Sequence, residues 1–129
     1  MSSADSLLAP VPGAECYEIG GALVDTVRVG AARLNVMVYP PGFRWSTHIK
    51  PIIGTDLCMH AHAGFLARGQ INVQYPDGWS AKFTAPQAAA IDPGHDAWIV
   101  GDEPAVLIEF DFGSATISRI GIPEAHRHT

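Results

Sequence analysis

The sequence predicts an all-β protein, a barrel or sandwich of many short strands. Short runs of apolar and β-branched residues alternate with polar ones in the two-residue period of a half-buried strand. Thirteen glycines and ten prolines, spread over 129 residues, separate these runs with turns. Apolar residues keep a helical period for three turns nowhere in the chain. These observations together favour a sheet-based fold.

The turns give the order of the elements. The small, polar, proline-interrupted residues 1–13 are expected to form an arm or a loose first strand, followed by a barrel domain at 14–121 and a tail at 122–129. An aromatic segment (43–46) and a loop (51–55) should lie between the second and third strands, and Pro76-Asp77-Gly78 predicts a hairpin. We predict strands at Ala22–Val29, Arg33–Tyr39, Cys58–Ala67, Gln70–Tyr75, Trp79–Thr84, Ala88–Ile91, Ala97–Val100, Ala105–Phe112 and Thr116–Ile120.

Composition excludes several classes of function. With 47% hydrophobic and 16% charged residues, the chain is too apolar to be disordered. A net charge of −5 and the absence of a dense Lys/Arg run argue against nucleic acid as a partner. No apolar stretch reaches about 18 residues, so no membrane span is expected. The N-terminus does not resemble a signal peptide, which favours the cytoplasm and reduced thiols at Cys16 and Cys58.

The most informative segment is Cys58-Met59-His60-Ala61-His62. In an extended strand, residues of one parity point to one face, so a thiol and two imidazoles should form one row. Neutral imidazole binds zinc, iron and nickel, and thiolate binds zinc and iron. A metal site is therefore expected here. The alternative is a pair of hydrogen-bonded interior histidines in a barrel without metal.

The order of the features resembles the cupin pattern. The His-bearing strand leads to an apolar run and Gly69, then to a hairpin at Asp77-Gly78, and then to Asp92-Pro93-Gly94 at the start of another strand. Cupins are double-stranded β-helix (jelly-roll) barrels, and the resemblance covers residues 35–112. More narrowly, residues 45–48, 58–62 and 93–98 resemble small single-domain bacterial cupins of the cupin 2 type. The resemblance implies an all-β cupin barrel that binds a metal.

The chain departs from the ligand pattern of that family. Aligned on Gly69, His62 occupies the position at which cupins usually carry Glu. In the second segment Ala97 occupies the usual His position, and His95 lies two residues earlier. A displaced set is available, and we predict His48, His60, His62 and His95 as ligands of a divalent metal ion (Zn, Fe, Ni or Mn). Cys58 is either a further ligand or a buried apolar residue.

The predicted function is that of a metal-binding cupin acting on a small organic acid or carbonyl compound, as an oxygenase, isomerase or lyase. Arg44, Trp45, Cys58 and Trp98 are the expected substrate-binding residues, because aromatic walls and a cation suit an anionic ligand. The alternatives are a non-catalytic small-molecule binding or sensing cupin without essential metal, and an accessory protein whose site has decayed. A homodimer formed by exchange of edge strands is also expected.

Overall fold

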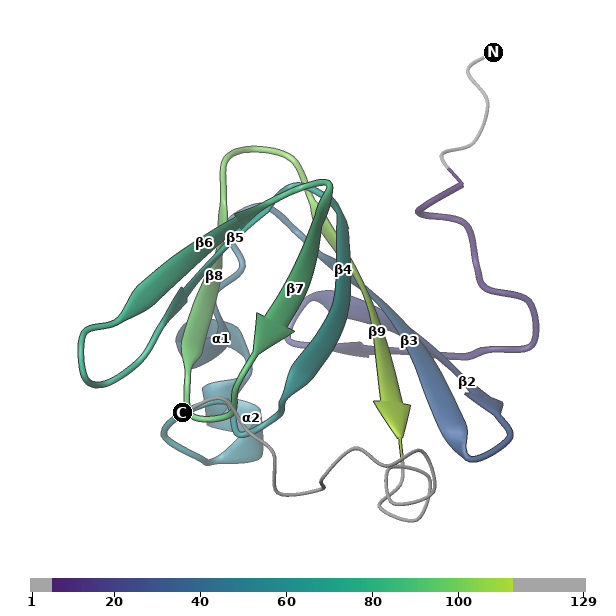
Figure 1. The fold of residues 1–129 in the computed structure, drawn as a ribbon, viewed down its shortest axis with the longest axis horizontal. Helices are drawn as coiled ribbons and strands as arrows, with labels where there is room; N and C mark the ends of the chain where they lie inside the picture. Colours follow the sequence, from purple (N-terminus) through teal and green to yellow (C-terminus); the bar gives the residue numbers. More distant parts are fainter. Residues whose placement is uncertain (1–5, 113–129) are drawn as a thin grey trace.

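The computed structural model describes residues 6–112, which form two antiparallel sheets around a common interior (Figure 1). In order across the larger sheet lie β1 (Glu15–Ile19), β2 (Ala22–Val29), β3 (Ala32–Tyr39), β9 (Ala105–Phe112), β4 (His62–Arg68) and β7 (Gln87–Ile91). The smaller sheet consists of β6 (Ser80–Thr84), β5 (Gln70–Gln74) and β8 (Asp96–Val100). This all-β jelly-roll architecture confirms the predicted fold class.

Strand β9 is the element that positions the site, because it pairs with β3 on one side and with β4 on the other. Glu109 of β9 is the register partner of both Asn35 and Gly64. Side chains alternate across a sheet, so Leu107 and Glu109 point into the barrel and Ile108 and Phe110 point away from it. Leu107 and Glu109 are accordingly almost completely buried.

The connection between β3 and β4 differs from the prediction. Residues 51–55 were expected to form a loop, and no helix was expected at the aromatic segment 43–46, but these residues contribute to two short helices, α1 (Trp45–His48) and α2 (Lys50–Ile53). Pro51 stands in the first turn of α2, where a missing amide hydrogen does no harm, and Gly54 ends it with φ of 89°. Helices of four residues are too short to show a helical period in sequence, which explains why the prediction was wrong.

The predicted strand Cys58–Ala67 is also wrong at its start, since β4 begins at His62. Cys58 instead forms an isolated bridge with His95 in the loop before β8. The Cys58 amide donates to the His95 carbonyl oxygen over 2.8 Å, and the Gly94 amide donates to the Cys58 carbonyl oxygen over 2.8 Å. The chain therefore crosses toward β8 before it joins the larger sheet.

The larger sheet begins with an edge strand near the N-terminus. Strand β1 at Glu15–Ile19 was not predicted, and it pairs with β2 at the edge of the larger sheet. The arm before it is tied to β2, because the Val11 amide donates to the Asp25 carboxylate over 2.9 Å. The predicted strand Thr116–Ile120 and the tail at 122–129 lie outside the described residues. Within residues 6–112, no helix has the length and apolar character needed to cross a bilayer.

Close approach of β4 to β9 depends on a glycine. A Cβ atom added at Gly64 would overlap the carbonyl oxygen of Ile108, which belongs to the backbone and cannot turn away. We expect Gly64→Ala to lower the free energy of unfolding by about 2–3 kcal/mol, as overpacking does. Urea denaturation followed by circular dichroism would measure this change.

Gly30→Ala is the matched control, because Gly30 has φ of 61° but open space around an added Cβ. Its free energy of unfolding should fall only by the cost of a left-handed backbone at a residue other than glycine, about 1 kcal/mol. A Gly64→Ala protein as stable as Gly30→Ala would contradict the close contact between the two strands.

Candidate metal and ligand site

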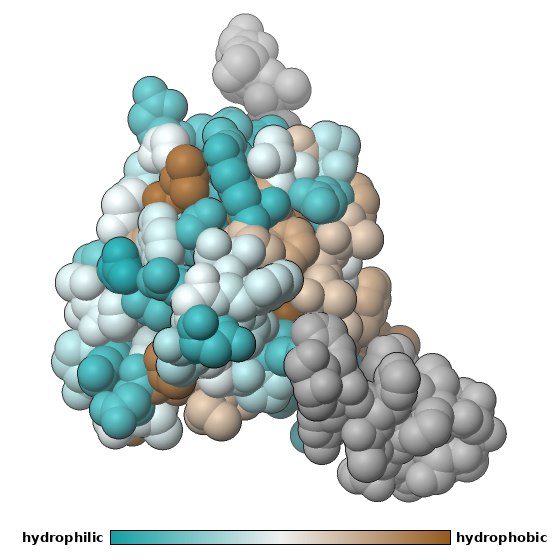
Figure 2. All heavy atoms as spheres, turned by 60° about the vertical axis from the view of Figure 1, so that its left-hand side comes forward, coloured by the Kyte–Doolittle hydropathy of each residue, from teal (hydrophilic) through white to brown (hydrophobic). Residues whose placement is uncertain are grey.

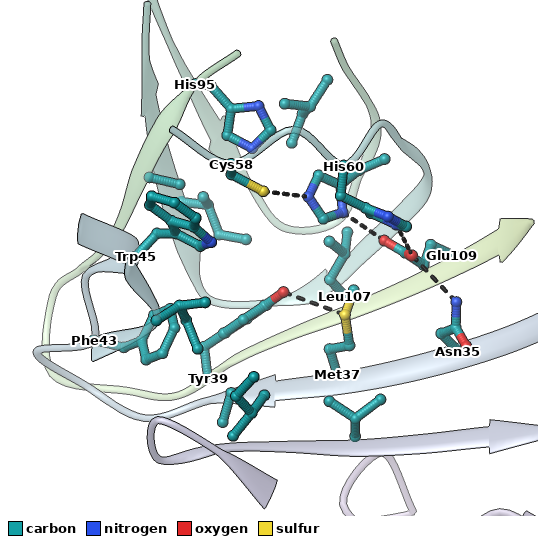
Figure 3. A pocket seen from close by; sticks show the side chains of 18 of the residues that line it. Asn35, Met37, Tyr39, Phe43, Trp45, Cys58, His60, His95, Leu107 and Glu109 are labelled. Atoms are coloured by element: carbon teal, nitrogen blue, oxygen red, sulfur yellow. Dashed lines mark hydrogen bonds and ion pairs between the residues drawn. The ribbon is translucent and has the colours of Figure 1, made fainter. Parts of the chain in front are cut away.

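A buried carboxylate lies at the centre of the site. The Glu109 side chain is 1% exposed, and it accepts hydrogen bonds from His60 Nε2 over 2.8 Å and from His62 Nδ1 over 2.5 Å (Figure 3). Asn35 Nδ2 donates to the same carboxylate over 3.2 Å. Burial alone would raise the pKa of Glu109, but the hydrogen bonds from the two histidines outweigh it and lower the pKa to about 2. Glu109 is therefore ionised at neutral pH.

The ionised carboxylate fixes which nitrogen of His62 carries hydrogen. A carboxylate can only accept, so His62 Nδ1 must donate, and the neutral ring then has its lone pair on Nε2. That nitrogen points at Cys58, with 4.0 Å between Nε2 and Sγ. His60 is held differently, because it donates its Nε2 hydrogen to Glu109 and its side chain is 45% exposed at the rim.

His95 presents a second lone pair to the same place. Its Nδ1 donates to the backbone carbonyl oxygen of Asp92 over 2.6 Å, so Nε2 is the acceptor of the neutral ring. Burial, above all, lowers the pKa of His95 to about 4, so the ring is neutral at pH 7. Burial likewise raises the pKa of the Cys58 thiol. Ligand atoms of Cys58, His62 and His95 all lie within 4.8 Å of one another.

The chemistry of these three groups fits a metal ion. Two imidazole lone pairs and a sulfur face one another, and the thiol hydrogen is the only proton that they can share. A divalent cation would satisfy all three and would displace that proton. A second group, His60, His62 and Glu109, also lies within 4.8 Å, but its donors and acceptor already satisfy one another. With such an ion bound, Glu109 would act behind His62, as carboxylates do behind metal-bound histidines.

A cavity of about 650 Å³ leads to this cluster. Cys58, His62, His95 and Glu109 all line it, whereas most of its remaining wall is apolar. Figure 3 shows Phe43, Trp45 and Tyr39 along the wall, with Met37 and Leu107 beside them. A volume in this range suits a small organic ligand. The interior of the barrel is therefore a chamber with one polar focus.

The predicted site residues are distributed unevenly around this chamber. His60, His62 and His95 line it, as do Trp45, Cys58 and Trp98. His48 and Arg44 are absent from its lining. His48 Nδ1 lies 3.0 Å from the Arg44 amide nitrogen, and its ring stacks on Phe43 with 5.4 Å between centroids.

Arg44 is bound to other side chains on the outside of the chamber. Its guanidinium pairs with Asp96 over 3.0 Å and lies over the Trp98 ring, 4.3 Å from the centroid. Sequence reasoning missed Arg33, which lines the cavity and pairs with Asp111 over 2.8 Å.

Glu109 is a further residue of the candidate site that the sequence interpretation missed. A signal was present, because Glu109 is an acidic residue inside the apolar run Ala105–Phe112, at the parity of the buried Leu107. A charge at an inward position of a strand requires hydrogen-bond donors or an opposite charge, and the His and Asn side chains of neighbouring segments can supply such donors. Asn35, the buried register partner of Glu109 on β3, was also overlooked.

The fold and the site together define the class of protein, a small antiparallel jelly-roll barrel with a His/Cys/Glu cluster in its interior. Solved structures identify this fold as that of the cupins. A cupin 2 conserved barrel domain protein from Salinispora arenicola superposes with a TM-score of 0.58 at 15% identity, covering 87% of this chain and 92% of that one. The Cnp3 cupin domain of Schizosaccharomyces pombe gives 0.55 at 11% identity, covering 88% and 80%. A cupin-like protein from Thermotoga maritima gives 0.52 at 16% identity, covering 73% and 70%.

The predicted resemblance to cupins is thus confirmed at the level of the fold. No family model matches the sequence, and no curated protein matches it either. The solved structures come from a yeast as well as from bacteria, so the fold alone does not assign this chain to a bacterial subgroup.

The pKa of His95 leads to a prediction about stability. Its folded pKa, about 4, lies below its ordinary value of 6.5, so the unfolded chain binds this proton more readily. Stability contributed by the neutral ring is complete above pH 6.5 and is lost as the pH falls toward 4. His95→Asn keeps a donor for the Asp92 carbonyl oxygen and removes the titration.

In the presence of a chelator, we expect the wild type to lose up to about 3 kcal/mol between pH 7 and pH 4 because of His95. His95→Asn should lose correspondingly less over the same interval. Urea denaturation at several pH values would measure both. Parallel profiles for the two proteins would show that His95 is not held neutral by its surroundings.

Proposed function

We propose that this protein is a metal-binding cupin that acts on a small organic acid or carbonyl compound held in the barrel cavity. The observation that carries the proposal is the convergence of Cys58 Sγ, His62 Nε2 and a lone pair of His95 on the inner wall of that cavity. Three protein ligands leave coordination positions open, as in catalytic sites and unlike structural ones. The reaction would be of the oxygenase, isomerase or lyase type.

Each residue of the cluster has a distinct task in this proposal. Cys58, His62 and His95 hold the ion, and a thiolate with two imidazoles suits zinc or iron. When bound, the ion supplies a Lewis acid that polarises an oxygen atom of the ligand. Glu109 keeps the Nδ1 hydrogen of His62 in place and so directs Nε2 toward the ion. The Asp92 carbonyl oxygen does the same for His95.

The wall of the cavity selects the rest of the ligand. Trp45 is buried, Trp98 is partly buried, and both line the cavity together with Phe43. Such a wall favours an aromatic or branched apolar body, whose single polar end would reach the cluster. His60 and Arg33 stand where the polar side of the cavity meets solvent. They suit contact with a carboxylate that enters or leaves.

Two predicted site residues take other tasks in this proposal. His48 Nδ1 lies against the Arg44 amide nitrogen in the β3–α1 connection, and the Arg44 guanidinium pairs with Asp96. We assign both residues to the support of the cavity wall. A cytoplasmic location fits the proposal, because Cys58 must be reduced to serve as a ligand and both cysteines are unpaired.

A second candidate function is ligand binding without essential metal. The observation in its favour is that His60, His62, Asn35 and Glu109 satisfy one another without any ion. The apolar cavity would then bind its ligand through shape, with Cys58 and His95 as the polar contacts. Metal content separates this candidate from the first one.

Metal content tests the ligand set directly. Protein purified without an affinity tag should carry, or take up after chelation, about one zinc or iron ion per chain. His62→Ala should abolish binding, and Cys58→Ser should weaken it at least ten-fold, since a hydroxyl is a poor ligand for these ions. Elemental analysis by mass spectrometry after dialysis would measure both.

His48→Ala and His60→Ala are the matched controls, and both should retain metal because neither belongs to the proposed ligand set. Wild-type protein with less than about a tenth of an ion per chain, and no uptake, would exclude the metal-dependent function. Loss of metal in His60→Ala but not in Cys58→Ser would instead assign the ion to the Glu109 side of His62.

Filling the cavity tests ligand binding independently of metal. Ala97 lines the cavity, and Ala97→Phe would occupy part of its volume. Benzoate and phenylacetate should raise the midpoint of thermal unfolding of the wild type by several degrees, whereas acetate should not. Ala97→Phe should abolish this shift.

Thr84→Phe, which adds a ring at an exposed position of β6, should leave the shift unchanged. The measurement is differential scanning fluorimetry at a fixed ligand concentration. An equal response of wild type and Ala97→Phe would place the binding of these acids outside the barrel.

A further inference from the structure

Two side chains of the mostly apolar cavity wall each carry one hydrogen-bond donor. Tyr39 ends β3 and Trp45 opens α1, and both line the cavity. In Figure 3 the hydroxyl of Tyr39 and the indole nitrogen of Trp45 point into the cavity, and the Cys58 sulfur atom faces the same space. The two donors therefore face the part of the cavity that holds the candidate metal ligands.

The indole N–H of Trp45 is an unused donor. Trp45 is only 9% exposed, and within residues 6–112 its N–H has no hydrogen-bond partner. An indole N–H at this depth usually has an acceptor. The backbone that carries the ring is fixed on both sides, because Arg44 forms a bridge to β8 and the Ser46 amide donates to the Asp96 carboxylate over 3.0 Å. The fold thus holds this donor toward the cavity.

The hydroxyl of Tyr39 is only weakly engaged. Its acceptor is the thioether sulfur of Met37 over 3.3 Å, and a thioether is a poor acceptor. Burial, above all, raises the pKa of Tyr39, so the phenol keeps its hydrogen. The Tyr39 ring packs on Phe43 with 5.0 Å between centroids, and Phe43 in turn stacks on His48. This hydroxyl is therefore a positioned donor that a stronger acceptor would recruit.

We propose that the Trp45 N–H and the Tyr39 O–H form a donor pair that binds the polar end of the ligand, and that this end is a carboxylate. The inference rests on the proposed function, because it requires the polar end to reach the cluster of Cys58, His62 and His95. One carboxylate oxygen meets that cluster, and the other accepts hydrogen bonds from the donor pair. The ligand class thus narrows from an organic acid or carbonyl compound to an acid.

The donor pair distinguishes an acid from its primary amide. The amide has nearly the same shape and can place its one oxygen on the cluster. It then turns toward Trp45 and Tyr39 an amino group, which cannot accept a hydrogen bond. A hydrogen bond to a charged oxygen is worth about ten-fold or more in affinity, and a site built of donors rejects an analogue that leaves them unpaired.

Donors on the outer surface cannot select in this way. The side of the molecule shown in Figure 2 carries the smaller sheet and is largely hydrophilic. Asn72 and Lys82, which are register partners on that sheet, lie among its polar residues. Donors in water exchange one partner for another with little gain. The donor pair acts in apolar surroundings, where the same hydrogen bonds are stronger.

Affinity for an acid and for its amide tests the donor pair. Isothermal titration calorimetry at pH 7 gives the dissociation constants of phenylacetate and phenylacetamide. Tyr39→Phe should weaken the binding of phenylacetate about ten-fold and change that of phenylacetamide by less than about two-fold. An equal ratio of the two constants in wild type and Tyr39→Phe would overturn this inference alone. A wild type that binds neither compound would overturn it together with the proposed function.

Tyr75→Phe is the matched control, because Tyr75 does not line the cavity and its hydroxyl has a strong acceptor, the Asp92 carbonyl oxygen at 3.0 Å. It should keep the wild-type ratio of the two constants but lower the midpoint of thermal unfolding by a few degrees. Tyr39→Phe should leave the midpoint nearly unchanged, because it gives up only a weak hydrogen bond. Equal losses in the two variants would show that the Tyr39 hydroxyl is already satisfied, and would overturn the inference without any ligand.

Nuclear magnetic resonance observes the second donor directly. The indole N–H resonance of Trp45, assigned by its loss in Trp45→Phe, should move downfield when phenylacetate binds but not when phenylacetamide binds. The resonance of Trp79, which is 56% exposed and lies between β5 and β6, should respond to neither. A Trp45 resonance that stays in place in protein saturated with phenylacetate would overturn the donor pair.

Discussion

The hydrogen bonds between the Glu109 carboxylate and the two histidines determine how the interior of this barrel is organised. A buried carboxylate is costly unless donors surround it, and His60, His62 and Asn35 provide three. Their geometry decides the tautomer of His62, and the tautomer decides where its free lone pair points. The charge of the ionised Glu109 carboxylate therefore sets the orientation of His62 and the position of the His62 Nε2 atom beside Cys58.

The strands around Glu109 hold that charge in place. Strand β9 is inserted between β3 and β4, so donors arrive from both of its neighbours, with Asn35 on one side and His62 on the other. Gly64 allows β4 to approach closely at the level of Glu109. The apolar cavity wall completes the arrangement, because it leaves the cluster as the polar focus of an otherwise apolar chamber.

Much of the fold could be predicted from the sequence, because strand periodicity and turn residues are local signals. His62 and His95, which the sequence interpretation assigned to one site, both line the interior cavity, and the fold comparison confirms the cupin resemblance. The two four-residue helices had no periodic signal. The row of Cys58, His60 and His62 does not lie on one strand, since Cys58 pairs with the distant His95. Contacts of that range are not encoded in local spacing. Glu109 did carry a local signal, an acidic residue at an inward position of an apolar strand, but the histidines that bind it could not be identified from that signal.

The bridge between Cys58 and His95 has a consequence for how the cluster assembles. Backbone hydrogen bonds in both directions hold these two residues together, outside either sheet. They form one unit that carries two of the three clustered side chains, whereas His62 lies on β4. The cluster therefore combines two parts of the fold, the Cys58–His95 bridge and His62 on β4. The distances between them depend on how residues 58–61 bend before the chain enters the larger sheet. A change of a single residue at positions 59–61 would therefore shift Cys58 relative to His62 without replacing Cys58, His62 or His95.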